Sequence, residues 1–138
     1  SLYKGANTAL TELDEEGYTI GGYYIICSDK ENNYNVPDNF NEDDFYKKMN
    51  KFFTENKKMD WFVVCEYGSA TYTAQSENWK NELVGTYPYG STTDGPRYYD
   101  TYYLSTTKRT KASLTKLYND AAKKVKEKAE SASYYDYY

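Results

Sequence analysis

The chain has 138 residues, enough for one compact domain with a modest core. Histidine is absent, which excludes histidine-based acid–base catalysis, nucleophiles activated by histidine, and histidine metal ligands. Residues 1–107 carry 9 Lys and Arg against 17 Asp and Glu, whereas residues 108–138 carry 8 against 4, within a net charge of −4. Such an acidic body and basic end can assemble head to tail, or they can be ordinary solvated faces.

The first predicted element is an amphipathic helix over residues 1–16. Apolar residues recur there at spacings of three and four and therefore share one helical face: Leu2, Ala6, Ala9, Leu10 and Leu13. Gly17 follows, at the position where a left-handed helix end favours glycine. Ser1 is the only residue available as an N-cap, so we expect this helix to be the second part of a longer one.

A strand and a second helix come next. The strand is predicted over residues 18–27, YTIGGYYIIC, where Gly21 and Gly22 mark a bulge or a turn that would make a hairpin. After a polar loop, Asn41 is a good N-cap for a helix at about residues 41–55. The apolar stripe of this helix predicts core packing: Phe45, Met49, Phe52 and Phe53.

The middle of the chain is rich in strand signals. Residues 59–76, MDWFVVCEYGSATYTAQS, predict two strands joined around Gly68 and Ser69. The stretch VGTYP ends a short apolar element, and Gly, Ser, Thr and Pro then mark a long exposed loop over residues 88–97. The stretch YYDTYYL, residues 98–104, predicts a last strand.

The C-terminal part is predicted as a basic helix over residues 111–130, followed by a tyrosine-rich tail, 131–138, to which we assign no structure. The order of elements predicts an α+β fold in a single domain, 1–138. In this fold the N-terminal helix packs on an antiparallel β-sheet, with an inserted helix and a C-terminal helix.

The two cysteines, Cys27 and Cys65, lie in two different predicted strands. If the strands are neighbours, the thiols could meet and form a disulfide, as in exported proteins. The alternative, which we favour, is two buried thiols that behave as small hydrophobic side chains. A metal site needs more ligands than two cysteines without histidine, and a catalytic cysteine would lack its usual base.

The sequence contains no motif for carboxylate-based catalysis or phosphate binding. No spacing of carboxylates singles out a catalytic pair, and the glycines match no phosphate-binding loop. We therefore expect no enzyme activity, no cofactor and no metal. Lysine and tyrosine interleave near the C-terminus, but the acidic body would repel phosphate, so we expect no nucleic-acid partner.

Two stretches carry a resemblance to a known family. The helix ANTALTELDEEGY and the stretch WFVVCEYGSATYTAQSENWKNELVGTYP resemble the soluble part of type IV pilins and pseudopilins of Gram-positive bacteria. The resemblance covers about residues 1–88. In that family a long N-terminal helix runs from a hydrophobic membrane segment into a globular head, where its second half packs on an antiparallel sheet. The prepilin cleavage site that defines the family is absent here, and the basic helix and tail depart from its pattern.

The resemblance implies a structural function. The protein would be a subunit of an extracellular, cell-surface filament, a type IV pilus or a pseudopilus, and its partners would be copies of itself or related pilins. Residues 1–16 would be the stump of the spine helix, with Leu2, Ala6, Ala9, Leu10 and Leu13 as its assembly residues. The membrane would be contacted only through an apolar segment that precedes residue 1.

The alternative is a binding module, an adhesin that uses exposed tyrosines. The chain holds 19 tyrosines, and six of them cluster around the predicted glycine- and proline-rich loop: Tyr87, Tyr89, Tyr98, Tyr99, Tyr102 and Tyr103. Tyrosine rings on an exposed loop can stack on sugars, so the partner would be a polysaccharide or a host surface. The competing explanation for these tyrosines is strand propensity and packing.

Overall fold

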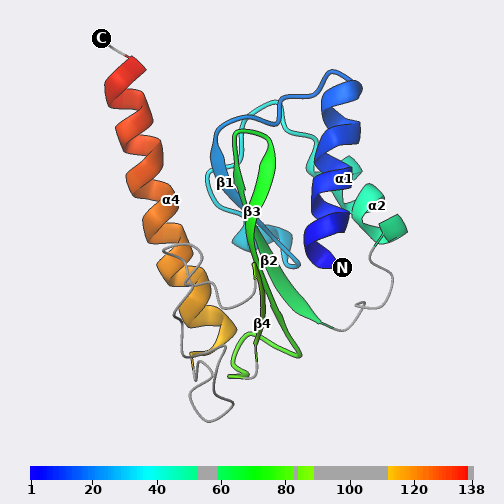
Figure 1. Ribbon diagram of the computed structural model, residues 1–138, viewed down its shortest axis with the longest axis vertical. Coiled ribbons are helices and arrows are strands. Elements are labelled where there is room, and N and C mark those ends of the chain that lie inside the picture. The colour runs from blue at the N-terminus through cyan, green and yellow to red at the C-terminus, as the bar shows by residue number, and fades with distance from the viewer. Residues whose placement is uncertain (53–58, 83, 89–111, 137–138) are drawn as a thin grey trace.

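The fold is described by a computed structural model for residues 1–52, 59–82, 84–88 and 112–136. It contains a four-stranded antiparallel sheet in the order β1-β2-β3-β4, in which each strand pairs with the next along the chain. The strands are β1 (Tyr23–Cys27), β2 (Asp60–Glu66), β3 (Ser69–Ser76) and β4 (Gly85–Tyr87). Helices α1 and α2 lie on one side of this sheet and α4 lies on the other (Figure 1). The predicted α+β architecture is confirmed.

Helix α1 (Leu2–Glu15) follows the expected pattern closely. The Ser1 hydroxyl accepts a hydrogen bond from the Lys4 backbone N–H, at 3.3 Å, and so caps the first turn. The helix ends where Gly17 takes a positive φ of 88°, a conformation that glycine adopts without a steric penalty. The apolar face of α1 packs on the sheet as part of one hydrophobic core.

Helix α2 (Glu42–Phe52) lies on the same face of the sheet. The Asn41 side-chain oxygen accepts a hydrogen bond from the Asp44 backbone N–H at 3.0 Å, which confirms the predicted N-cap. Phe45 and Met49 are buried in the core beside α1, as the stripe predicted. The side chains of the other two stripe residues, Phe52 and Phe53, lie outside the described residues.

Helix α4 (Leu114–Asp136) covers the opposite face of the sheet. Its buried residues recur at helical spacing and form a second core with that face: Leu114, Leu117, Ala121 and Val125. The sequence prediction was wrong about its end, because the backbone stays helical through residues 131–136 of the expected tail. No glycine or proline interrupts this stretch, so each added residue extends an existing helix at little cost.

Two predicted strand boundaries also need correction. Residues 18–22 are not a strand: β1 begins only at Tyr23, after Gly22 takes a positive φ of 97°. The turn between β2 and β3 is formed by Tyr67 and Gly68, and Ser69 already belongs to β3. The two registers agree with these corrections, because Tyr23 is the first residue of β1 paired with β2, opposite Glu66, and Glu66 in turn pairs with Ser69 of β3.

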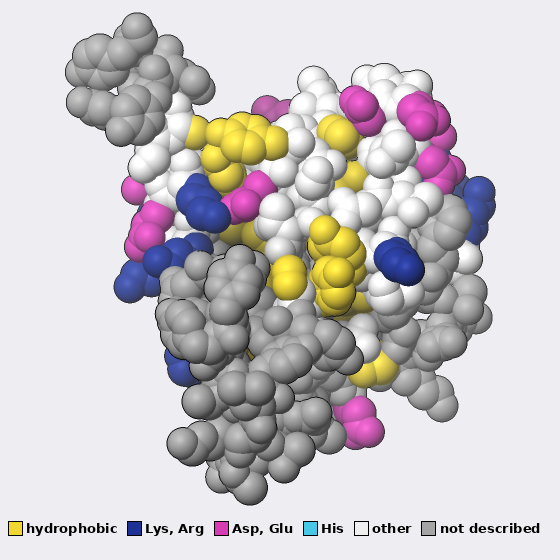
Figure 2. All heavy atoms as spheres, viewed as in Figure 1, with side chains coloured by type: hydrophobic (Ala, Val, Ile, Leu, Met, Phe, Trp, Pro, Cys, Tyr) yellow, Lys and Arg dark blue, Asp and Glu magenta, His cyan; other side chains and the backbone are white. Residues whose placement is uncertain are grey.

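The surface visible in Figure 2 carries hydrophobic side chains in separate small patches among polar ones. None of the helices in the described parts of the chain has the length and apolar character needed to cross a membrane. Residues 89–97 of the loop predicted over 88–97, and all of the strand predicted over residues 98–104, lie outside the described residues.

Candidate functional site

The five apolar residues of α1 proposed for assembly are all inside the protein. Leu2 is 3 % exposed, and the other four are fully buried: Ala6, Ala9, Leu10 and Leu13. They pack against residues of the sheet and of α2 in one core. Their role is therefore to fix α1 to the sheet, and they are not available to contact a second molecule.

Asn7 connects α1 to an irregular point of the sheet. Its side-chain oxygen accepts a hydrogen bond from the Ala70 backbone N–H at 2.9 Å. The β2–β3 register shifts next to Ala70, between Val64 and Cys65, so β3 carries an extra residue there. A bulge disturbs the ladder, and Asn7 supplies an acceptor for a backbone N–H beside it. Sequence reasoning missed this residue, because no local pattern signals a partner 63 positions away.

The first turn of α1 also contacts the edge of the sheet. The ring of Tyr3 lies against the ring of Tyr87 in β4, with centroids 4.4 Å apart. Tyr87 is 47 % exposed and is the one member of the predicted tyrosine cluster within the described residues. The other five lie outside them: Tyr89, Tyr98, Tyr99, Tyr102 and Tyr103.

Lys48 joins the two helices on this face. Its side chain is buried, and its ammonium lies 2.6 Å from the Glu16 carboxylate, just after the end of α1. Asp44 and Glu12 approach the same ammonium at 3.8 and 3.9 Å. The hydrogen bond to Glu16, and then the charges of all three carboxylates, raise the pKa of Lys48.

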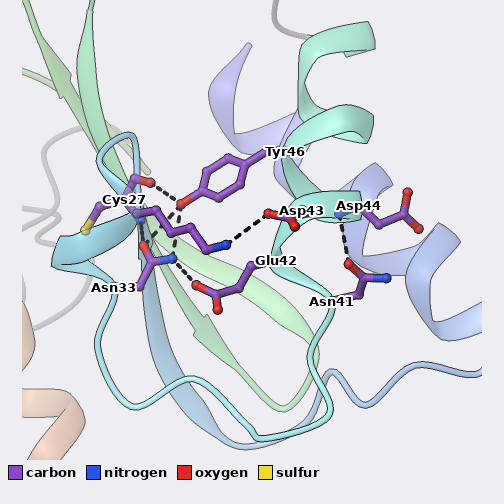
Figure 3. Close-up of polar contacts among 8 residues, drawn as sticks. Cys27, Asn33, Asn41, Glu42, Asp43, Asp44 and Tyr46 are labelled. Carbon is purple, nitrogen blue, oxygen red and sulfur yellow. Dashed lines mark hydrogen bonds and ion pairs between the residues drawn. The ribbon is translucent and has the colours of Figure 1, made fainter.

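A polar network fixes α2 to the end of β1 (Figure 3). The Asn33 side-chain oxygen accepts from the Cys27 backbone N–H, and its NH2 group donates to the Glu42 carboxylate, each at 2.6 Å. The Tyr46 hydroxyl donates to the Cys27 carbonyl at 2.6 Å. Burial raises the pKa of Tyr46 to about 12. These groups satisfy one another, so the network is a structural junction and not a reactive site.

The two cysteines are free and buried. Their strands are neighbours, but Cys27 lies opposite Phe62 and Cys65 lies opposite Tyr24. These pairs are three positions apart along the ladder, so the two thiols point to opposite faces of the sheet and cannot form a disulfide. Cys27 belongs to the core beneath α4 and Cys65 to the core beneath α1. Burial raises the pKa of both thiols, which keeps them protonated and unreactive.

The turn between β2 and β3 presents the most exposed large hydrophobic side chain in the described part of the chain, Tyr67, at 73 %. Its hydroxyl accepts a hydrogen bond from the Tyr23 hydroxyl at 2.6 Å, and the two rings meet edge to face with centroids 4.9 Å apart. This hydrogen bond is the main cause that raises the pKa of Tyr23 to about 12. The sequence prediction did not single out either residue.

The described residues contain no group of three or more histidine, cysteine, aspartate or glutamate side chains that could hold a metal ion. Three features of the described residues bear on function. They are the helix α1, whose apolar face is buried, the contact between Tyr3 and Tyr87 at its first turn, and the exposed Tyr67 at the β2–β3 turn. Comparisons of this chain with protein families, with curated proteins and with solved structures found no match.

Proposed function

We propose that the protein is a structural subunit of an extracellular, cell-surface filament of the type IV pilus or pseudopilus kind, which acts by assembly and not by catalysis. The observation that carries the proposal is the complete burial of the apolar face of α1 on an antiparallel sheet, from Leu2 to Leu13. In a filament, a pull on the spine helix must be passed to the globular head. A helix whose apolar face is buried on the sheet of the head can do this without separating from it.

The contacts of α1 make the attachment rigid along its length. Tyr3 contacts β4 at the first turn, Asn7 binds β3 at the second, and Glu16 pairs with Lys48 just after the last. Hydrophobic packing between these three points excludes water and fixes the rotation of the helix. The sheet and α1 therefore behave as one body in the proposal.

Within the described part of the chain, the outer face of α1 is exposed and could contact other copies. Its exposed residues recur at spacings of three and four and are polar: Lys4, Thr8, Thr11, Asp14 and Glu15. The Thr8 and Thr11 hydroxyls donate to the carbonyls of Lys4 and Asn7, each at 2.9 Å. In the proposed filament, this outer face of α1 would contact α1, or the residues beside α1, of neighbouring subunits.

The test is immunogold electron microscopy of cells that carry the gene, with an antibody raised against the 138-residue chain. We expect gold particles in rows along surface filaments, and we expect both filaments and label to disappear when the gene is deleted. Label that stays inside the cells, or that covers the surface evenly without filaments, would overturn the proposal. A matched strain with an unrelated surface protein deleted controls for loss of the envelope.

A further inference from the structure

Tyr67 stands at a backbone position that does not suit tyrosine. Tyr67 and Gly68 form the two-residue turn between β2 and β3, and both have positive φ angles, 52° and 85°. A turn of this kind favours Asn followed by Gly. The left-handed conformation brings the Cβ atom close to a carbonyl oxygen; Gly has no Cβ, and the short polar side chain of Asn offsets the cost by local hydrogen bonds. The chain provides the glycine, but it places a bulky aromatic residue where Asn would be less strained.

Burial of the side chain does not explain why Tyr67 occupies this strained position. The Tyr67 side chain is mostly exposed, so it buries little surface in return for the strain. Its ring orientation is nevertheless fixed, because its hydroxyl is bonded to the Tyr23 hydroxyl and the two rings are in contact. Strain that persists at an exposed, ordered side chain is a feature of binding sites. The ring is held ready before any ligand arrives, which lowers the entropy cost of binding.

The surroundings of Tyr67 suit a small, flat, hydroxyl-rich ligand. The Tyr67 backbone N–H donates to the Gly22 carbonyl at 3.0 Å, which places the exposed Gly21 and Gly22 beside the turn. A side chain added at either glycine would meet nothing within 4 Å, so the space above them is open. Glu66, the residue before Tyr67, lies opposite Tyr23 in the ladder, and its carboxylate forms an ion pair at 2.5 Å with the ammonium of Lys128 in α4. This pair offers an acceptor and donors on the side of the sheet where Tyr23 contacts Tyr67.

We propose that Tyr67 is a carbohydrate-binding residue that stacks on the apolar face of a pyranose ring, with Glu66 and Lys128 as hydrogen-bonding partners for the sugar hydroxyls. The C–H groups of a sugar with equatorial hydroxyls match the negative face of an aromatic ring.

This inference does not depend on the filament proposal, although the two are compatible. The β2–β3 turn lies beside the loop that follows the C-terminal end of α1 (Figure 1). Tyr87, against which the ring of Tyr3 packs, pairs with Thr73, farther along β3 from this turn. A site there would stay accessible if the N-terminal end of α1 pointed into a filament. It also differs from the tyrosine cluster predicted from the sequence, whose one described member is Tyr87.

The experiment is retention of the 138-residue chain on insoluble cellulose and on chitin, together with a printed glycan array. Three variants are compared with the unchanged chain: Tyr67→Asn, Tyr67→Phe and Tyr87→Asn. Tyr67→Asn removes the ring but suits the turn, so its thermal midpoint should be unchanged or higher, and a loss of binding cannot be ascribed to unfolding. Tyr67→Phe keeps the ring and removes the hydroxyl, and Tyr87→Asn removes the exposed tyrosine of β4.

We expect at least one of the probes to retain the unchanged chain and Tyr67→Asn to lower its affinity about tenfold or more. Tyr67→Phe should bind more weakly than the unchanged chain but better than Tyr67→Asn, because it keeps the ring and loses the hydrogen bond that fixes it. Tyr87→Asn should bind within about threefold of the unchanged chain. Three results would overturn the inference: no retention on any probe, equal retention of Tyr67→Asn, or an equal loss in Tyr87→Asn. Sedimentation measurements test whether the turn instead binds a second copy of the chain. Self-association of the unchanged chain that Tyr67→Asn abolishes would assign the turn to a second copy and not to carbohydrate.

Discussion

At the scale of single residues, the β2–β3 turn depends on Gly68 for two separate reasons. Its φ of 85° is strained for any other residue, and a Cβ there would lie 2.8 Å from the Ile20 Cδ1 atom. We expect Gly68→Ala to lower the free energy of unfolding by about 2 kcal/mol. Chemical denaturation monitored by circular dichroism measures this change.

Two other glycines are matched controls for Gly68. Gly21→Ala has open space and no positive φ, so it should be neutral or stabilising by about 0.5 kcal/mol. Gly17→Ala has a φ of 88° but open space, so it isolates the backbone strain from the clash. An equal loss of stability in Gly21→Ala and Gly68→Ala would contradict the strain and the clash assigned to Gly68.

The two cysteines give a second prediction at this scale. Because Cys27 and Cys65 are buried, protonated and on opposite faces of the sheet, neither should react with a thiol reagent in the native protein. Both should react once denaturant unfolds the chain, and a reducing agent should leave the thermal midpoint unchanged. Titration with a chromogenic disulfide reagent counts the thiols. A count of zero in the unfolded chain under non-reducing conditions would show a disulfide and refute the register.

Residues with local signals could be predicted from the sequence, and residues with distant partners could not. The buried stripe of α1 and the Asn41 cap depend on neighbours within a few positions, and both are confirmed. Asn7 and Lys48 owe their roles to partners 63 and 32 positions away, which only the folded chain brings together. For the cysteines the sequence left two alternatives, because the strand register decides between them.

At the scale of the elements, the attachment of α1 to β3 depends on Asn7. Asn7→Ala removes the acceptor of the Ala70 N–H next to the bulge, and we expect a loss of about 1–2 kcal/mol in the free energy of unfolding. Thr8→Ala is the matched control on the same helix. Its hydroxyl is exposed and bonds only within α1, so the change should stay within about 0.5 kcal/mol. Equal effects of the two substitutions would mean that Asn7 does not support the bulge.

The helices and the strands β1, β2 and β3 were predicted better than their ends, whereas β4 (Gly85–Tyr87) was not predicted as a strand. Helical spacing located α1, α2 and the buried part of α4, since each turn of a packed helix repeats the signal. The strand prediction over residues 18–27 extended too far, because Tyr18 and Ile20 suit a strand although the ladder begins only at Tyr23. The end of α4 was missed because residues 131–136 carry no periodic apolar pattern, yet they contain no glycine or proline that would stop a helix already formed.

At the scale of the whole molecule, the tyrosines predict how stability depends on pH. The native fold raises the pKa of Tyr23, Tyr46 and Tyr118 from 10.0 to about 12. A raised pKa means that the native protein keeps protons that the unfolded chain releases. The stability that these three tyrosines contribute is therefore full below about pH 10 and is lost between about pH 10 and 12. The raised pKa of Lys48 acts in the same direction.

Denaturant unfolding at several pH values from about 9 to 12 tests this expectation, with the absorbance of tyrosinate followed in parallel. We expect the free energy of unfolding to decline through this range, and some tyrosines to ionise well after the exposed ones. A free energy that is constant from about pH 10 to 12, with all tyrosines ionising together near the lower value, would contradict the burial and hydrogen bonding of Tyr23, Tyr46 and Tyr118.

The layered arrangement of the molecule was only partly predictable. The order of helices and strands predicted the α+β class and the packing of α1 on an antiparallel sheet, and both are confirmed. Helices α1 and α2 cover one side of the sheet and α4 covers the other. This arrangement depends on which residues of each strand point to each side. A one-residue change of register would exchange these faces, and periodicity alone does not fix it.

The proposed filament function requires α1 to be the head-embedded half of a spine helix. The most direct measurement is to read the codons that precede Ser1 in the gene. The proposal predicts a short basic leader followed by about twenty predominantly apolar residues, with a glutamate near their start. A start codon immediately before Ser1, or a polar domain in place of the apolar segment, would contradict the filament function and leave the Tyr67 turn as the main lead.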